Sequence, residues 1–417
     1  MLLRRRSRLF VLVSQTALTI DPLCYEAFDA LASGHMLTPT EEAAMLATLQ
    51  WAPGDGWVGA LYGIQASAHN AGANLPAQLD TLAAEAAAAG AGDEAVAALR
   101  ENADVVAATA EWALARGEVS TAYAATSALL ARDPLRASAL PTHLSAAATL
   151  GKRNELFARG HDLVQADPES GVAWYAVGCY YASAGQHAAA RRFLAKCTAV
   201  APGFAPGWLA YGHAFAAMDE TDQALAAYRT AVRLFPGTPA PLLWVGVEYG
   251  RAVNWPLARQ FLQMASEACP SDPAPFHELG CIELRAGEPQ AAQAAFEQAL
   301  NLAPQPLTET WEVRPVCQRA LAECAAFDAS RRAQTQPTFF GLGHSLRKQG
   351  KLEAAEEAYR RALGLVPRSA STLVALAFTA QLRGDNTTAV ELYHVALGLR
   401  PDDGCVICMV SGAPCAL

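Results

Sequence analysis

Large and small apolar residues recur every 34 residues through the middle of the chain. In each unit a large apolar residue is followed by a glycine after four residues, by an alanine after sixteen and by a second large residue after twenty. Spacings of four place side chains on one face of a helix, so each unit predicts two helices, and a closing proline ends the second. The four clearest units contain Trp174, Gly178, Ala190, Leu194 and Pro202; Trp208, Gly212, Ala224, Tyr228 and Pro236; Leu242, Gly246, Ala258, Leu262 and Pro270; and Phe276, Gly280, Ala292, Phe296 and Pro304.

Helix pairs of this kind must stack. Glycine on the first helix lets the second helix approach closely, and glycines such as Gly185 and Gly287 suit the turn between them. One pair cannot bury its own apolar face, so neighbouring pairs together form a continuous core. The period and the paired helices are typical of tetratricopeptide repeats. The sequence therefore predicts an all-α fold, a superhelical solenoid of antiparallel helix pairs.

The repeat register divides the chain into six segments. Weaker units precede the four clear ones, and two well-matched units follow an insertion. One segment rich in alanine and glycine breaks the period; we expect helix with a flexible loop there, and treat the segment as irregular because alanine offers little to bury. The expected segments are partial N-terminal repeats in 1–58, the irregular segment in 59–102, repeats in 103–304, an insertion or loop in 305–336, two repeats in 337–403 and a C-terminal tail in 404–417.

The first twenty residues allow two interpretations. Arginines followed by the apolar run 9–13 could form a signal peptide, but the run is short and no clear cleavage site follows it. In the repeat register the same residues form the second helix of a unit whose first helix is missing, which accounts for more of the pattern. A further helix then starts at Glu41 and Glu42, with Thr38 or Thr40 as its cap.

Composition indicates a folded chain whose main partner is not a nucleic acid. Of the 417 residues, 52% are hydrophobic and 17% are charged, which is ample apolar material for a core. The net charge of −9 disfavours binding to phosphates, since such binding needs a basic surface. No run of about 18 apolar residues occurs, so we expect no membrane span. The ten cysteines lack a dense framework, as expected for reduced thiols in the cytoplasm or nucleus.

No motif for catalysis or for a cofactor stands out. The sequence has no glycine-rich phosphate loop and no HExxH zinc motif, and its nine histidines are scattered. Cys405 and Cys408 have the spacing of metal ligands, but one pair without further ligands is more simply interpreted as structural or fortuitous. We therefore expect a protein that is not an enzyme and that holds no cofactor or metal.

Candidate binding residues lie on the first helix of each unit, at positions that face the concave surface of such an array. They are mostly apolar or small and suit the apolar face of an inserted peptide or helix, although some could merely pack between helices. A clamp for chaperone carboxylates would need lysine and asparagine at the fifth and ninth positions, and neither occurs there in these units. The candidate residues are Tyr175, Cys179, Leu209, His213, Leu243, Val247, His277 and Cys281.

Residues outside the repeat consensus resemble one family. Cys24-Tyr-Glu-Ala-Phe-Asp-Ala-Leu31, Trp174-Tyr-Ala-Val-Gly-Cys-Tyr-Tyr181 and Gly207-Trp-Leu-Ala-Tyr-Gly-His213 are similar to subunit six of the anaphase-promoting complex, or cyclosome. The resemblance covers roughly 21–403, apart from the alanine-rich segment and the insertion.

The resemblance implies a non-catalytic scaffold of a ubiquitin ligase that directs cell-cycle proteins to degradation. In that family the subunit is a homodimer joined through N-terminal repeats, its C-terminal superhelix encloses a segment of a small accessory subunit, and it stacks on sister repeat subunits. We expect these partners, in the nucleus and cytoplasm, with the enclosing groove from Trp174 onward. Because the chain begins inside a repeat, we expect most of the dimerisation region to be absent from it.

Two other functions stay open. The chain could be a repeat adaptor of another pathway, such as a chaperone partner or a transport factor. It could also be an enzyme with a cryptic site, such as a metal at Cys405 and Cys408. Binding of a chaperone tail peptide would favour the first alternative, and stoichiometric zinc would favour the second.

Overall fold

The computed structural model describes residues 2–302 and 335–401, except 33, 35, 53, 69–73 and 271. Within this part of the chain the regular elements are helices, with no strand. The chain divides into two compact units, Met1–Ser271 and Asp272–Leu417. Most of the expected insertion, the expected tail and the pair Cys405 and Cys408 lie outside the described residues.

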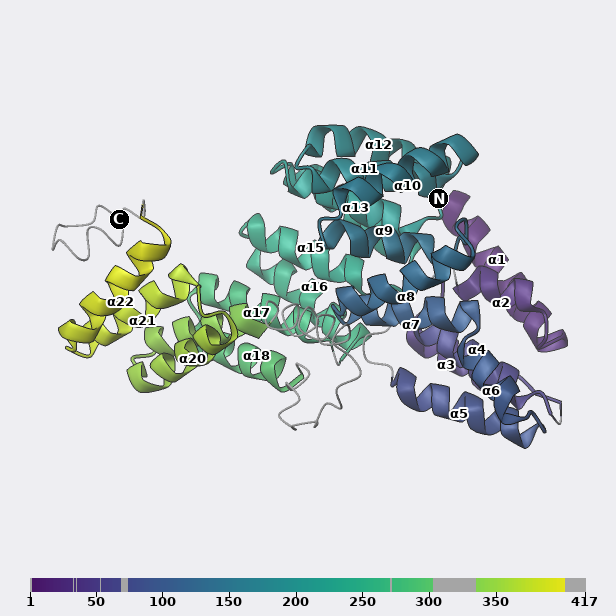
Figure 1. Ribbon diagram of the computed structural model, residues 1–417, viewed down its shortest axis with the longest axis horizontal. Coiled ribbons are helices and arrows are strands. Elements are labelled where there is room, and N and C mark those ends of the chain that lie inside the picture. Colours follow the sequence, from purple (N-terminus) through teal and green to yellow (C-terminus); the bar gives the residue numbers. More distant parts are fainter. Residues whose placement is uncertain are drawn as a thin grey trace. The chain divides into compact units, whose positions relative to one another are not determined.

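The first unit begins with helices α1 to α6, which differ in length (Figure 1). Thr38 caps α3 as one of the two expected threonines: the backbone N–H of Glu41 donates to its hydroxyl, and its own N–H donates to the Glu41 carboxylate. The N-terminal residues form a helix, as the repeat register predicts, and it packs against α2. These helices are α1 Leu2–Ile20, α2 Tyr25–Ala32, α3 Pro39–Thr48, α4 Gly56–Ser67, α5 Leu75–Ala88 and α6 Asp93–Arg100.

The alanine-rich segment contains helices, as the sequence led us to expect. Residues 59–102 include most of α4 and all of α5 and α6. Ile64 and Leu82 are completely buried there, and Leu75 is 1% exposed. Alanine itself favours helix, and the few large residues at helical spacing supply the apolar face that alanine lacks.

Antiparallel helix pairs in the predicted register make up the rest of the first unit. Each pair has a first helix of 10–13 residues and a second of 14. Consecutive helices from α10 to α15 also contact one another along the chain, which is how stacked pairs share a core. The pairs are α7 Ala103–Ala115 with α8 Val119–Arg132, α9 Leu140–Thr149 with α10 Arg153–Ala166, α11 Gly171–Ser183 with α12 His187–Val200, α13 Ala205–Ala216 with α14 Thr221–Leu234, and α15 Ala240–Arg251 with α16 Trp255–Ala268.

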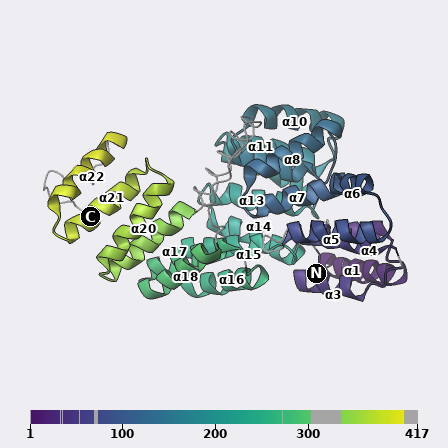
Figure 2. The ribbon, with the colours of Figure 1, turned by 60° about the horizontal axis from the view of Figure 1, so that its bottom comes forward.

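The second unit continues with the same kind of pair (Figure 2). Residues 335–348 are helical and precede α20, so they take the place of a first helix. The named helices are α17 Pro273–Ala286, α18 Pro289–Leu302, α20 Leu352–Leu365, α21 Ala370–Leu382 and α22 Asn386–Leu399.

Glycine on the first helix makes room for the large residue of the second, as the sequence predicts. A side-chain carbon on Gly178 would lie 2.5 Å from Leu194, and one on Gly246 would lie 2.7 Å from Leu262. Such distances are shorter than real contacts, so a larger residue there requires the facing side chain or its helix to shift. The same overlap occurs between Gly212 and Tyr228, Gly280 and Phe296, and Gly343 and Tyr359.

The turn inside each pair requires a left-handed backbone. Glycine supplies it in most pairs, for example Gly151 with φ of 69° and Gly185 with φ of 76°. In two pairs the same place holds Asp219, with φ of 58°, and Val253, with φ of 59°. A branched side chain is strained in this conformation, so the turn geometry follows from the stacking and is not chosen by the local sequence alone.

Two kinds of hydrogen bond join successive pairs and were not anticipated from the sequence. The indole N–H of Trp174 donates to the carbonyl of Pro168 at 2.8 Å, and that of Trp208 donates to Pro202 at 3.0 Å. In addition, a basic side chain near the end of a first helix reaches the carbonyl end of the preceding first helix. These bonds run from Arg251 to Ala216 and from Lys348 to Leu284, both at 3.1 Å.

Candidate partner-binding surface

The eight candidate residues lie on the first helices of four pairs. Six of them lie in the first unit, on α11, α13 and α15, and the other two lie on α17 in the second unit. On each helix the two residues are four positions apart, so they share one face. By helix they are Tyr175 and Cys179, Leu209 and His213, Leu243 and Val247, and His277 and Cys281.

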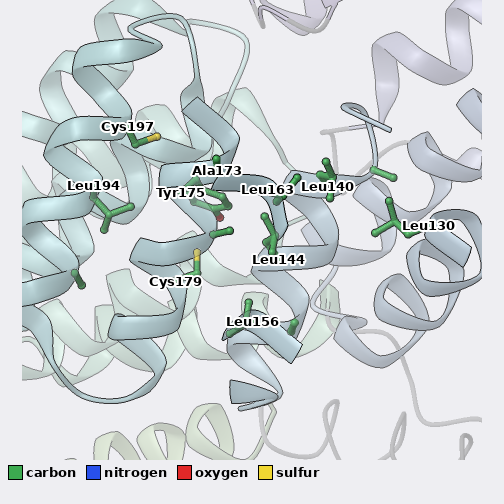
Figure 3. Packing of buried hydrophobic residues seen from close by; sticks show 14 of the residues in the cluster. Leu130, Leu140, Leu144, Leu156, Leu163, Ala173, Tyr175, Cys179, Leu194 and Cys197 are labelled. Atoms are coloured by element: carbon green, nitrogen blue, oxygen red, sulfur yellow. The ribbon is translucent and has the colours of Figure 1, made fainter. Parts of the chain in front are cut away.

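Tyr175 and Cys179 are buried in the packing of the chain itself (Figure 3). Tyr175 is 4% exposed, and its ring packs edge-on against Phe204 of the following pair at a centroid distance of 5.3 Å. Cys179 is 6% exposed, and burial raises the pKa of its thiol to about 12. Both residues therefore have the packing role that the sequence left open for this set. A direct contact with a partner stays a prediction for them.

Leu209, Leu243 and Val247 keep partial access to solvent, and His213 is exposed. The three apolar side chains come from the first helices of two neighbouring pairs, α13 and α15. Half-buried apolar side chains on adjacent helices offer area that a partner helix or peptide can bury. These residues are the accessible part of the candidate surface in the first unit.

His213 forms a hydrogen bond with the hydroxyl of a buried tyrosine. Its Nδ1 lies 2.6 Å from the hydroxyl of Tyr228, and its ring lies edge-on to Trp244 at 4.5 Å. The surrounding protein lowers the pKa of His213 to about 4, although contact with water at the exposed ring offsets part of this effect. At neutral pH the ring is uncharged, so Nδ1 can accept the hydrogen bond from Tyr228.

The same arrangement recurs in the second unit. His344 occupies the matching position, and its Nδ1 lies 2.9 Å from the hydroxyl of Tyr359. Burial, with a smaller contribution from Arg347 and Lys348, lowers the pKa of His344 to about 4. The two histidines thus each accompany a buried tyrosine, which gives them a structural role in addition to any contact with a partner.

His277 and Cys281 form a pair on α17. The Sγ of Cys281 lies 3.7 Å from Nε2 of His277, and Nδ1 of His277 lies 3.0 Å from the hydroxyl of Thr338. Burial lowers the pKa of His277 and raises that of the Cys281 thiol to about 12. A nucleophilic cysteine needs a lowered pKa, so this pair lacks the chemistry of a cysteine–histidine catalytic site.

A buried polar network joins the α7–α8 and α9–α10 pairs. His143 is completely buried; its Nδ1 lies 3.1 Å from the Thr126 hydroxyl, and its Nε2 lies 3.0 Å from a carboxylate oxygen of Glu155. The other carboxylate oxygen accepts a hydrogen bond of 2.5 Å from the Tyr123 hydroxyl. Burial opposes the charge on Glu155, but these hydrogen bonds and His143 outweigh it and lower the pKa of the carboxyl group. Because the carboxylate only accepts, Nε2 of His143 carries the hydrogen.

The order hydroxyl, imidazole, carboxylate in this network resembles a catalytic triad. However, Thr126 is completely buried, and its hydroxyl also lies 2.8 Å from the carbonyl of Ala122, to which it can donate. A nucleophile must reach its substrate, so this hydroxyl cannot serve as one in the folded chain. Among the described residues, histidine, cysteine and carboxylate side chains form no cluster able to hold a metal ion. In the same part of the chain no helix combines the length and apolar character needed to cross a membrane.

Family models described as tetratricopeptide repeat match this chain at 172–204, 209–273, 275–306 and 340–404. Anaphase-promoting complex subunit 6 of Arabidopsis thaliana is 37% identical over 389 residues, which are 93% of this chain and 67% of that protein. The chain belongs to the anaphase-promoting complex subunit 6 family. The cell division cycle protein 16 homolog of Homo sapiens is 36% identical over 93% of this chain, and the chain spans 58% of the length of that relative.

A solved structure extends this family assignment to the fold. The crystal structure of the APC/C hetero-tetramer Cut9-Hcn1 contains a chain that is 28% identical to this one, with a TM-score of 0.72. The match covers 95% of this chain and 71% of that chain. The predicted all-α tetratricopeptide solenoid and the resemblance to the subunit 6 family are both confirmed.

Proposed function

We propose that this chain is a non-catalytic scaffold subunit of the anaphase-promoting complex, a ubiquitin ligase of the cell cycle. The observation that carries this function is the 37% identity to the Arabidopsis subunit 6 over 93% of the chain. The fold agrees with that role, because stacked helix pairs present extended surfaces to partner proteins. Burial raises the pKa of the Cys179 and Cys281 thiols and encloses the Thr126 hydroxyl, so these three groups are not nucleophiles.

The proposed partners are other subunits of the complex, including a small accessory subunit and sister repeat subunits. The accessory subunit would contact the accessible first-helix residues Leu209, Leu243 and Val247, with His213 beside them. The location in the nucleus and cytoplasm belongs to the same proposal. No nucleic-acid or membrane partner is part of it, in keeping with the net charge of −9.

Affinity purification tests the assignment to the complex. The tagged chain, expressed in cells of its own source and purified under mild conditions, should bring down other subunits of the anaphase-promoting complex. Recovery of the tagged chain with none of these subunits would refute the proposal. Recovery of a chaperone in their place would favour the adaptor alternative.

A pair of variants tests the binding surface. Leu243→Glu places a charge on the half-buried apolar face of α15, so it should weaken the recovery of partner subunits. Met264→Glu introduces the same charge on α16 of the same pair, at a side chain that is 41% exposed. This control should retain the partners. Circular dichroism should give equal helicity for both variants; equal recovery of partners would show that the first-helix face is not the contact surface.

A further inference from the structure

A second surface feature lies between α10 and α11, and none of the eight candidate residues lines it. It is a hollow of about 510 Å³ lined by Arg153, Asn154, Phe157, Tyr180 and Ala184, which we call the α10–α11 pocket. Phe157 is 58% exposed, and its ring lies 5.5 Å from that of Tyr180. A large aromatic side chain exposed beside a hollow is a feature of binding sites, since aromatic residues dominate the energetics of protein interfaces.

The polar side chains of the pocket have unused hydrogen-bonding capacity. Arg153 forms no ion pair within the described residues, and in the same part of the chain the Asn154 amide has no hydrogen bond. A guanidinium group carries five donors that match a carboxylate, and an amide can pair with a peptide backbone. The pocket therefore combines an apolar wall with a free cation and a free amide.

The side chains that line the pocket carry charge of one sign only. Helix α11 contains no charged residue, so Arg153 supplies the only charge among the lining side chains. The nearby Glu155 is already engaged by Tyr123 and His143 through both of its carboxylate oxygens. Lys152 lies next to Arg153 in sequence, and its Nζ is 3.4 Å from the centroid of the Tyr123 ring. The pocket is thus locally positive in a chain whose net charge is −9.

We propose that the α10–α11 pocket binds an acidic segment of a partner protein, in which a carboxylate stands next to an aromatic side chain. The carboxylate pairs with Arg153, the aromatic side chain packs on Phe157 and Tyr180, and Asn154 bonds to the peptide backbone. A basic segment would be repelled by Arg153. A purely apolar segment would cover this cation without a partner for it, which carries a desolvation cost. The acidic and aromatic combination is the one that satisfies every lining group.

Short blocked peptides provide the test. The probe is acetyl-Glu-Phe-Glu-amide, titrated into the full chain labelled with ¹⁵N-arginine while the Nε–H signal of Arg153 is followed by NMR. Saturable shifts of this signal are expected with the probe. The charge-reversed acetyl-Lys-Phe-Lys-amide and the anchorless acetyl-Glu-Gly-Glu-amide should each bind at least about tenfold more weakly, because each loses one kind of contact.

Variants separate the pocket from general electrostatic attraction. Phe157→Ser should lower the affinity for the probe at least about tenfold, measured by the same NMR signal. Arg153→Gln should lower it by a similar factor, measured in a fluorescence assay with the labelled probe. Arg192→Gln removes an exposed charge from α12 and should leave the affinity unchanged. Similar affinity for all three peptides, an equal loss with Arg192→Gln, or no saturable shift would overturn the proposal. Because the peptides are tested on the isolated chain, this outcome is independent of membership in the ubiquitin ligase.

Discussion

The α9–α10 pair and the α13–α14 pair hold large and small residues in opposite order at the same two repeat positions. In α13–α14 the small residue Gly212 lies on the first helix, opposite Tyr228 on the second. At the matching places in α9–α10 the sizes are exchanged, with Leu144 on the first helix and Gly160 on the second, and both are buried. In both pairs one of the two positions holds a small residue, but Gly160 faces Val177 of the following helix, whereas Gly212 faces Tyr228 of its own pair.

The two pairs also differ in how they keep a buried polar group. In α13–α14 the single hydroxyl of Tyr228 is bonded to His213 of the same pair. In α9–α10 the buried His143 is bonded to Glu155 of its own pair and to Thr126 of the pair before it. A buried polar group without partners is costly, so Tyr228 and His143 are each stabilised by these bonds. The buried His143 thus links two successive pairs, whereas the bond of Tyr228 stays within its own pair.

The largest loss of stability is expected when a side chain is added at Gly212 in the α13–α14 pair. Gly212→Leu would drive its side chain into the Tyr228 ring and should lower the free energy of unfolding by about 3 kcal/mol. Urea denaturation followed by circular dichroism measures this change. A loss of less than about 0.5 kcal/mol, the usual range for surface substitutions, would contradict the close packing at this position.

Breaking the polar network of the earlier pair should have the next largest effect. Glu155→Ala leaves the Nε2–H of His143 and the hydroxyl of Tyr123 without their acceptor, so we expect a loss of about 2 kcal/mol. Asp162→Ala on the same helix removes an exposed carboxylate and serves as the control. If both variants unfold at the same urea concentration, the network does not stabilise the earlier pair.

Contacts that recur from pair to pair could be predicted from the sequence, and contacts outside the repeat could not. The 34-residue period identified Gly212 with Tyr228 and the turn glycines, because the same residue types recur in most pairs. It could not identify the bond between Tyr123 and Glu155, which lie 32 residues apart and outside the consensus positions. The indole bonds of the tryptophans were missed for a related reason, since their acceptors are backbone carbonyls that leave no mark in the sequence.

The candidate surface was predicted less fully than the fold. Periodicity places a residue on a face of its helix, but accessibility depends on the size of the residue that the next pair brings against it. Tyr175 is covered by Phe204 of the following pair, whereas Leu209 and Leu243 keep partial access. In the alanine-rich segment, a few large buried residues such as Leu82 anchor the helices.

The turns of the two kinds of pair differ in backbone strain, and a substitution at one of them should stabilise the chain. Val253→Gly gives the α15–α16 turn the residue that Gly151 supplies in the α9–α10 turn, and should raise the free energy of unfolding by about 1 kcal/mol by relieving the left-handed strain. Asp219→Gly should gain less, since aspartate tolerates this conformation better than valine. Thermal melts of the two variants measure the effect. A lower melting temperature for Val253→Gly would contradict strain at this turn.

The uncrowded glycine of the earlier pair should accept a side chain. A carbon on Gly160 would lie 3.5 Å from Val177, an ordinary van der Waals distance, so Gly160→Ala should stabilise the chain by about 0.5 kcal/mol through better helix propensity. Gly212→Ala should instead destabilise the chain. Thermal melts of both alanine variants under the same conditions measure the two changes. Changes of the same sign in melting temperature would contradict the difference in crowding between Gly212 and Gly160.

The smallest expected effect concerns pH and the His213 of the later pair. Its pKa in the folded chain is lowered to about 4 from the ordinary value of 6.5, so between these values the unfolded chain binds a proton that the folded chain does not. Stability should therefore decrease as the pH falls from 6.5 toward 4 and should lose nothing further from this group below that range. Because the ring touches water, the contribution is modest. His213→Gln should reduce the slope of melting temperature against pH in this window, while His161→Gln, at an exposed ring of the earlier pair, should leave it unchanged. A slope that is the same in all three proteins would mean that the bond to Tyr228 does not hold the imidazole in its neutral form.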